Sequence, residues 1–408
     1  MKILQLCNKI PYPPKDGGSI ATFNLTKSFA ALEQQVDILA INTSKHYVDL
    51  QKISKEIAPI TKINGVYINT ETSFVGAFIN LLFSRKPYNA QRFISKKFAD
   101  AIKEQLQNSV YDIIQLEGLY LIPYVPIIRQ YSNALISYRA HNVEHEIWER
   151  TAKNTQSRLK RRYITNLSNR IKQMEVAALN TYDVILPITQ RDAFSLEKMG
   201  NLKPVHITPT GIDTQNIIPK NSDIEYPSLF HIGSLDWTPN QEGLVWFVDN
   251  CWYTLNKQFP DLKFYIAGRN APDWLISKFH KKNIVYCGEV DDAQAFMQNK
   301  AIMVVPLFSG SGMRIKIIEG MALGKTIITT TIGSEGIFST HRKNILLAET
   351  KEQFIEEISE IINNKSLFQL IEKNSIRFIR KYFDNIEITK SLIEFYTSQL
   401  EIRNQISN

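Results

Sequence analysis

Two cations and a carboxylate stand together in one short segment. A predicted helix opens with Arg314 and Lys316 and carries Glu319, and it follows an apolar strand and a loop with two glycines, Gly310 and Gly312. A helix N-terminus presents free N–H groups and positive partial charge, and glycines let an anion approach the backbone. Lys316 and Glu319 share one helix face. This segment could bind a diphosphate and a ribose hydroxyl pair, although solvated charges on an ordinary strand-loop-helix unit explain it about as well.

A second loop with paired glycines, Gly17 and Gly18, joins the first predicted strand to a helix expected to begin near Ile20. Paired glycines permit close approach of the backbone to a ligand. The loop is not a G-x-G-x-x-G fingerprint, and a tight strand-to-helix turn explains it nearly as well.

A histidine, His141, follows the carboxyl end of another predicted strand. Ligands of open α/β sheets bind at that end of the strands, so we assign His141 to a site. His145 is expected on the surface of the next helix.

The chain is basic, and its charge is uneven. Residues 1–210 hold 27 Lys and Arg against 17 Asp and Glu, a net charge of +10, whereas residues 211–408 hold 21 against 23, a net charge of −2. This asymmetry predicts an anionic partner for the first half. The sequence has no zinc-finger, RRM-like or helix-turn-helix signature, so we expect no nucleic acid.

Two basic stretches suggest transient contact with an anionic membrane, although a solvated face explains them as well. No acid stands between Glu149 and Glu175, a stretch that contains Arg158, Lys160, Arg161, Arg162 and Arg170. The segment Phe74 to Phe98 mixes large apolar side chains with Arg85, Lys86, Arg92, Lys96 and Lys97.

Composition and length indicate a globular protein of two domains, because 408 residues can bury two cores. Three separated cysteines and the lack of a signal peptide or a span of ~20 apolar residues favour a cytoplasmic protein. No D-x-D, H-E-x-x-H or P-loop occurs in a suitable context, so we expect no metal and no cofactor.

Strand-like and helix-like stretches alternate, which predicts an α/β protein with parallel sheets. Expected strands of the first half are Lys2–Asn8, Val36–Asn42, Tyr111–Glu117, Ala134–Ala140, Val184–Ile188 and Val205–Thr208. Those of the second half are Leu229–Ser234, Lys263–Ala267, Ile284–Cys287, Ile302–Leu307, Thr326–Thr330 and Asn344–Leu347. A capping box at Thr189 predicts a helix through Met199. The expected domains are residues 1–210 and 211–385, with a C-terminal helix, 386–408, that returns to the first domain.

The segment around Glu319 resembles the donor-nucleotide motif of family 4 retaining glycosyltransferases, which have the GT-B fold. It carries Pro306, Gly310, Gly312 and the run E-G-M-A-L-G-K. Many members have another glutamate seven residues before Glu319, where this chain has Ser311. That departure resembles a subgroup with G-x-G-x-R-x-K before the motif glutamate.

The resemblance implies two Rossmann-like domains facing across a cleft. It implies that the Gly17–Gly18 loop lies at that cleft, that His141 lies over the donor sugar, and that Glu289 and Val290 meet the nucleobase. Many members place Arg and Lys after the strand that ends near Ser234. This chain has neither, so Arg314 and Lys316 are expected to bind the diphosphate, with Arg269 as a weaker candidate.

The implied function is metal-independent transfer of a sugar, with retention, from a nucleotide-sugar donor to a glycan or lipid-linked acceptor, in cell-surface polysaccharide synthesis. In this reading Glu319 binds the ribose. Three alternatives stay open: another GT-B enzyme such as a nucleotide-sugar epimerase, a catalytically silent GT-B-like binding subunit, and a two-lobed solute-binding protein.

Overall fold

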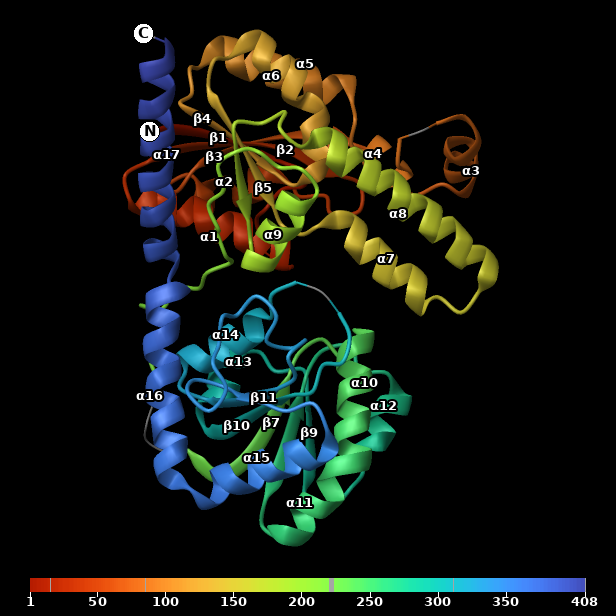
Figure 1. Cartoon of the computed structure of the whole chain (residues 1–408), viewed down its shortest axis with the longest axis vertical. Coiled ribbons are helices and arrows are strands. Elements are labelled where there is room, and N and C mark those ends of the chain that lie inside the picture. Colours follow the sequence, from red (N-terminus) through yellow and green to blue (C-terminus); the bar gives the residue numbers. More distant parts are fainter. Residues whose placement is uncertain (15, 85, 220–223, 311, 408) are drawn as a thin grey trace. The chain divides into compact units, whose positions relative to one another are not determined.

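The computed structural model describes residues 1–14, 16–84, 86–219, 224–310 and 312–407. The chain divides into two compact units, Met1–Gly211 with Ile388–Asn408, and Ile212–Glu387. Each unit contains a six-stranded parallel sheet with helices on both faces (Figure 1). The predicted α/β class is therefore confirmed.

The sheet of the first unit has the order β3-β2-β1-β4-β5-β6, and every pairing is parallel. Its strands are β1 (Lys2–Cys7), β2 (Gln35–Thr43), β3 (Lys62–Ile68), β4 (Ile113–Glu117), β5 (Leu135–Ala140) and β6 (Val184–Pro187). Successive side chains point to opposite faces. Leu4 and Leu6 join a core with helices α5 and α8, whereas Ile3 and Cys7 join a core with α1 and α17. Both faces are covered, which explains why these strands are continuously apolar.

Two expectations for this sheet were wrong. The strand β3 was missed, because Asn64 and Gly65 interrupt its apolar pattern and because an edge strand is only half-buried. The predicted strand Val205–Thr208 forms only an isolated bridge, between Val205 and Ile185, so short β-like sequence did not suffice for a strand.

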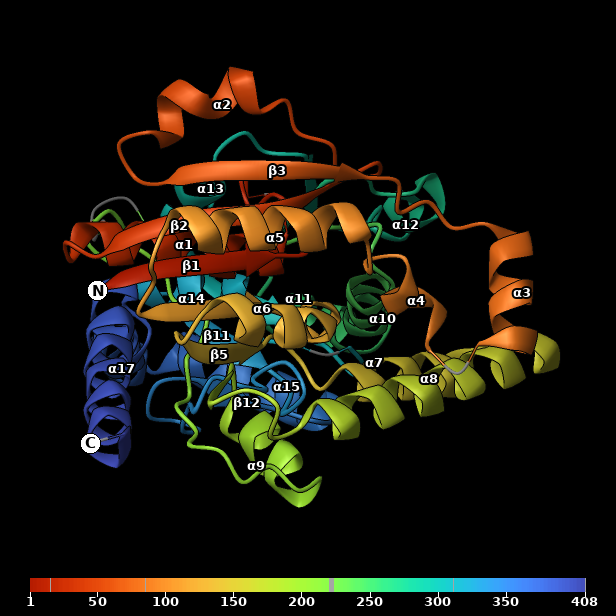
Figure 2. The ribbon, with the colours of Figure 1, turned by 90° about the horizontal axis from the view of Figure 1, so that it is seen from above.

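The helices of the first unit connect these strands. They are α1 (Gly17–Ala31), α2 (Leu50–Ile57), α3 (Phe74–Phe83), α4 (Tyr88–Gln91), α5 (Lys96–Asn108), the 3₁₀ helix η1 (Leu119–Tyr124), α6 (Val125–Tyr131), α7 (Glu144–Asn154), α8 (Arg158–Ala178) and α9 (Gln190–Lys198). The predicted cap of α9 is confirmed, since Thr189 Oγ1 accepts from the backbone N–H of Asp192 at 3.0 Å. Helices α7 and α8 form an antiparallel pair that extends away from the sheet, and α3 lies beside α8 (Figure 2).

The sheet of the second unit has the order β12-β11-β10-β7-β8-β9, again parallel. Its strands are β7 (Glu225–Ile232), β8 (Lys263–Ala267), β9 (Ile284–Gly288), β10 (Lys300–Val305), β11 (Thr326–Thr329) and β12 (Leu346–Leu347). Its helices are α10 (Thr238–Phe247), the π-helix η2 (Val248–Trp252), α11 (Tyr253–Gln258), α12 (Asp273–Lys278), α13 (Ala293–Gln298), α14 (Ile315–Ala322), α15 (Lys351–Asn363) and α16 (Lys365–Tyr382). Helices α10 and α15 pack on one face, and α14 packs on the other.

The last helix, α17 (Asn385–Ser407), belongs to the first unit from Ile388 onward. Its Tyr396 is fully buried beneath the sheet of that unit, with its hydroxyl oxygen 2.8 Å from Gln115 Oε1 and 2.8 Å from Ser137 Oγ. The tail of the sequence therefore completes the core of the first unit.

Candidate active site

The predicted phosphate-binding segment lies at the carboxyl end of β10, the position where open parallel sheets bind ligands. Gly310 and Gly312 have φ angles of +109° and +82°, so both need glycine. A Cβ atom at Gly310 would also lie 3.0 Å from Nη2 of Arg314 and from the Trp237 ring. With glycine at these two positions, neither residue has a side chain to cover the loop backbone just before α14. Ser311 lies outside the described residues.

The buried Arg314 is the N-cap residue of α14. Its guanidinium lies over the Trp237 ring, 5.4 Å from the centroid, and its Nη1 donates to the carbonyl of Gly312. A guanidinium stacked in this way is pre-oriented and loses little freedom when it binds a ligand.

Lys316 reaches the loop after β7, where the sequence has no cation of its own. Its Nζ donates to Asn240 Oδ1 at 2.9 Å and lies 3.3 Å from His231 Nε2. A Cβ atom at Gly233 would lie 3.0 Å from this Nζ, so glycine makes room for the ammonium. Tertiary structure thus brings a cation to the strand end that lacked one. Nearby, Arg269 Nε donates to Ser234 Oγ at 3.0 Å.

His231 is a residue of this site that the sequence analysis missed. It is fully buried, and its Nδ1 lies 2.8 Å from the carbonyl of Val304, so Nδ1 carries the proton and Nε2 faces Lys316 as an acceptor. Burial, and then the charge of Lys316, lower the pKa of His231 well below its usual value. The only signal in the sequence was a histidine within an otherwise apolar strand.

The pKa shifts of Lys316 and Glu319 both favour the neutral form of the side chain. Burial, and then Arg314, lower the pKa of Lys316 to about 7. Burial raises the pKa of the Glu319 carboxyl to about 7, and within the described ranges no group bonds with that carboxyl. A sequestered carboxyl without a protein partner can bind hydroxyls of a ligand.

Glu289 and Val290, predicted to meet a nucleobase, follow β9 at the edge of the sheet. Glu289 is exposed, and Val290 packs partly into the core. The strands β7 and β8 separate β9 from β10. The role of Glu289 and Val290 stays a prediction.

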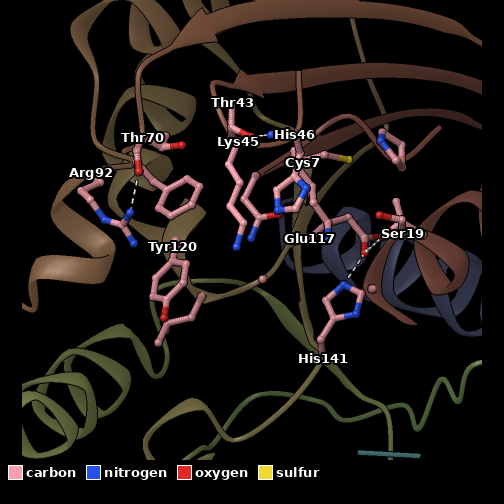
Figure 3. A pocket seen from close by; sticks show the side chains of 18 of the residues that line it. Cys7, Ser19, Thr43, Lys45, His46, Thr70, Arg92, Glu117, Tyr120 and His141 are labelled. Atoms are coloured by element: carbon pink, nitrogen blue, oxygen red, sulfur yellow. Dashed lines mark hydrogen bonds and ion pairs between the residues drawn. The ribbon is translucent and has the colours of Figure 1, made fainter. Parts of the chain in front are cut away.

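The first unit has its own pocket, of about 350 Å³, at the carboxyl ends of β1, β4 and β5 (Figure 3). Its lining includes Lys9, Gly18, Lys45, Arg92, Glu117, Tyr120, His141 and Glu144. His141 therefore lines a cavity. The lining combines cations, carboxylates and an aromatic ring, a mixture suited to a polar, hydroxylated ligand.

Glu117 is the residue of this pocket that sequence reasoning missed. It pairs in register with Arg139 on β5, and His141 follows two residues later, so all three side chains share one face. Glu117 Oε2 lies 2.7 Å from His141 Nε2 and accepts from Thr22 Oγ1 at 2.9 Å, while Arg139 Nη1 lies 3.5 Å away. The signal was a lone acid at the end of an apolar strand.

The carboxyl of Glu117 is ionised despite complete burial. Burial alone would raise its pKa, but Arg139, His141 and Gln115 outweigh that effect and lower the pKa to about 2. A fixed negative charge therefore lies against His141 and determines how its ring is oriented.

The expectation for His145 was wrong. Its side chain is buried, and Nδ1 lies 2.6 Å from Glu175 Oε2 on α8. Glu175 also accepts from the backbone N–H groups of Glu144 and His145, which satisfies the start of α7. Burial, and then Glu175, raise the pKa of Glu144 to about 7.

The Gly17–Gly18 loop differs from the prediction in one respect: α1 begins at Gly17, not near Ile20. Asp16 caps this helix, since its Oδ1 accepts from the backbone N–H of Ser19 at 3.1 Å, and it pairs with Lys9 at 2.5 Å. A Cβ atom at Gly17 would meet nothing within 4 Å, so the space beside it is open. Gly18 lines the pocket.

Comparison with known proteins adds a partial family match to this geometry. Residues 226–364 match the model of the family Glycosyl transferases group 1. The matched segment lies within the second unit and includes the loop after β7, Arg314, Lys316 and Glu319.

Solved structures resemble the whole chain and show that it has the GT-B fold. Sucrose-phosphate synthase from Thermosynechococcus elongatus is 15% identical, with a TM-score of 0.68 over 98% of this chain and all of that one. Anabaena HepE in complex with UDP and glucose is 14% identical, with a TM-score of 0.65 over 98% of this chain and all of that one. TarM of S. aureus, in a mutant form with UDP and alpha-GlcNAc-glycerol, is 13% identical, with a TM-score of 0.66 over 97% of this chain and all of that one.

Two curated proteins are related in sequence. A 44.6 kDa protein from the cps region of Klebsiella pneumoniae is 23% identical over 407 residues, covering 96% of this chain and 99% of that protein. A glycosyltransferase of Methanocaldococcus jannaschii is 34% identical over 94 residues, which cover 22% of this chain and 26% of that protein.

Proposed function

We propose that this chain is a glycosyltransferase that moves a sugar from a nucleotide-sugar donor to a glycan or lipid-linked acceptor, with retention and without a metal. The observation that carries the proposal is the arrangement at α14. Two cations and a helix N-terminus stand at one strand end, and a carboxyl with no described partner follows three residues after Lys316. The match to the group 1 family and the GT-B fold support this reading.

The donor would bind to the second unit through complementary charge. Arg314 and Lys316 would meet the diphosphate, and Glu319 would accept hydrogen bonds from the ribose hydroxyls. Lys316 is held by Asn240 and His231, both neutral, and the charge of a bound diphosphate would favour the protonated form of Lys316. UDP-sugars are the first donors to test, since UDP is present in the structures of HepE and TarM.

In the transfer itself, the bond between the sugar's anomeric carbon and the diphosphate oxygen breaks, and the acceptor oxygen bonds to the same carbon on the same face. The acceptor proton would pass to the departing phosphate. Arg314, Lys316 and the N–H groups of α14 would stabilise the charge that develops on that phosphate. A protein metal is then unnecessary.

The pocket of the first unit would supply the remaining contacts. His141, oriented by Glu117, would line the donor-sugar site. Lys9, Lys45 and Arg92 give the pocket a positive side, which favours an anionic acceptor such as a lipid-linked glycan precursor. The related protein from a cps region supports a role in cell-surface polysaccharide synthesis.

A panel of UDP-, GDP-, ADP- and TDP-sugars, monitored by thermal shift, tests the donor site, because a ligand of the native state raises the melting temperature. We expect one base to be preferred and the shift to be lost in Glu319→Gln. The matched control is Glu356→Gln, which changes an exposed glutamate of α15. No shift with any nucleotide would overturn the donor-site assignment.

Turnover experiments separate the alternatives. With donor and a mixture of lipid-linked acceptors, NMR of the product should show the donor's anomeric configuration, with activity unchanged by EDTA. An epimerase would convert the nucleotide-sugar without an acceptor, and a silent binding subunit would bind nucleotide without turnover. Inversion at the anomeric carbon would contradict the retaining assignment.

A further inference from the structure

Helix α3 carries an apolar stripe that faces solvent. Val75, Phe78, Ile79, Leu82 and Phe83 are 68, 62, 53, 58 and 83% exposed. Their spacing of i, i+3, i+4, i+7 and i+8 places them on a single helix face. Such a stripe ordinarily packs into a core, so α3 presents to the outside the face that most helices bury.

The orientation of α3 is set by its opposite face. Arg170 on α8 donates to Asn80 Oδ1 at 3.3 Å and to the carbonyls of Asn80 and Leu81 at 3.2 and 2.9 Å. Asn80, itself buried, donates to the carbonyl of Lys86 at 3.1 Å. Ser73 caps the helix by accepting from the N–H of Gly76. These bonds fix α3 beside α8 (Figure 2) and leave the apolar stripe exposed.

The neighbouring helix α8 is strongly cationic. Residues 150–174 contain eight Lys and Arg and no acid. Arg158, Lys160, Arg161 and Arg162 are all exposed, and Leu159 between them is 85% exposed. Within the described part of the chain, no acid pairs with these four cations. Arg85, which belongs to the basic segment after α3, lies outside the described residues.

We propose that the apolar stripe of α3 and the four cations of α8, here called the α3–α8 face, dock on an anionic bilayer surface. The aromatic and aliphatic side chains would enter the interface, and the cations would meet the lipid headgroups. Among the helices that the structure describes, none is long and apolar enough to cross a membrane, so this would be contact from one side.

Charge favours a bilayer over a second copy of this chain. A symmetric dimer through the α3–α8 face would bring the cationic turn of α8 near its own copy, with no acid on that stretch to compensate. An anionic leaflet offers an apolar layer for the apolar stripe of α3 and a negative surface for the cations of α8.

The location of Arg92 connects the α3–α8 face to the pocket of the first unit. Arg92 lines that pocket and also a surface hollow formed with Gly76, Ile79, Phe83 and Tyr88. If the proposed function is correct, a lipid-linked acceptor would reach the pocket from this side. Docking itself does not depend on that function.

Vesicle binding tests the proposal without any activity assay. The full chain is sedimented at low salt with phosphatidylcholine vesicles and with vesicles containing about 30% phosphatidylglycerol. We expect at least roughly 10-fold stronger binding to the anionic vesicles, falling as salt rises. Arg158→Gln, Lys160→Gln, Arg161→Gln and Arg162→Gln combined should remove most of it, and so should Phe78→Ser with Phe83→Ser.

Matched controls change exposed residues of the same types elsewhere. Phe194→Ser on α9 replaces an apolar side chain that is 53% exposed, and the four-cation control is Lys257→Gln, Lys281→Gln, Lys282→Gln and Lys365→Gln. Neither control should weaken binding, and circular dichroism checks that every variant folds. Nucleotide thermal shifts should persist in the α3–α8 variants.

Three results would overturn the proposal. One is no binding to anionic vesicles at low salt, and another is equal binding to neutral and anionic vesicles. The third is vesicle binding that neither α3–α8 variant reduces. A dimer in light scattering that Phe78→Ser with Phe83→Ser dissolves, without vesicle binding, would assign this face to a second copy instead.

Discussion

Tyr396 on the C-terminal helix is connected to His141 through two buried side chains. The Tyr396 hydroxyl lies 2.8 Å from Gln115 Oε1, Gln115 Nε2 donates to Glu117 Oε1, and Glu117 Oε2 lies 2.7 Å from His141 Nε2. These residues come from α17, β4 and the end of β5. The last helix of the chain therefore helps to position the strand-end histidine of the pocket.

Glu117→Gln should lower kcat/KM for sugar transfer by roughly 10- to 100-fold, because it removes the negative charge that orients His141, and a hydrogen bond to a charged group is worth about 1.5–3 kcal/mol. Nucleotide affinity, measured by calorimetry, should be unchanged, since Glu117 lies in the first unit. Thr22→Val is the milder companion variant, because it removes one bond to Glu117 and keeps the charge. Wild-type transfer by both variants would remove Glu117 from the mechanism.

Tyr396→Phe should lower the free energy of unfolding by about 1–3 kcal/mol, since it removes the hydroxyl that lies against buried Gln115 Oε1 and Ser137 Oγ. Chemical denaturation measures this loss. Tyr382→Phe on α16, where the side chain is 48% exposed, is the control and should change stability little. If both substitutions have the same small effect, the chain of bonds through Gln115 contributes no stability.

Glu319→Ala should weaken nucleotide binding by roughly 1.5–3 kcal/mol while the fold stays intact. The reason is the loss of the carboxyl that would bind the ribose hydroxyls. Calorimetry with the nucleoside diphosphate and with its 2′-deoxy form gives the measurement. Unchanged affinity in the variant, or equal affinity of the wild-type protein for both ligands, would place the ribose elsewhere.

Lys316→Met should weaken binding of a nucleoside diphosphate far more than binding of the nucleoside, because only the former carries phosphate charge. At about pH 8, above its pKa of about 7, Lys316 is mostly neutral, so diphosphate binding should take up a proton. Calorimetry in buffers of different ionisation enthalpy detects that uptake, which the variant should lack. Equal losses for both ligands would mean that Lys316 only shapes the loop.

The raised pKa of Glu319 predicts how stability depends on pH without ligand. Between its ordinary value near 4.5 and its folded value of about 7, the folded state keeps a proton that the unfolded state has released. The contribution of Glu319 to the free energy of unfolding should therefore fall as pH rises through that window and level off above it. Glu319→Gln should flatten this fall, whereas the control Glu356→Gln should not. An identical pH profile for Glu319→Gln would show that the carboxyl titrates normally.

The sequence by itself determined the fold class and the local motifs. Apolar strands alternating with amphipathic helices predicted parallel sheets, because a strand covered on both faces must be apolar throughout. Eleven of the twelve strands that the structure describes overlap stretches predicted as strands, and the exception is the edge strand β3. The α14 motif was also visible, since Arg314, Lys316 and Glu319 are neighbours in the chain.

Only tertiary structure decided which distant side chains meet. Lys316 contacts Asn240 and His231, which precede it by 76 and 85 residues. Glu117 contacts Thr22 and His141. The sequence showed large apolar side chains in the segment of α3 but not where they point, because bonds from Arg170 on α8 decide that. A sequence pattern indicates which side chains of an element are apolar. Whether those side chains are exposed, and which charged groups pair, depends on the elements that pack against that element in the fold.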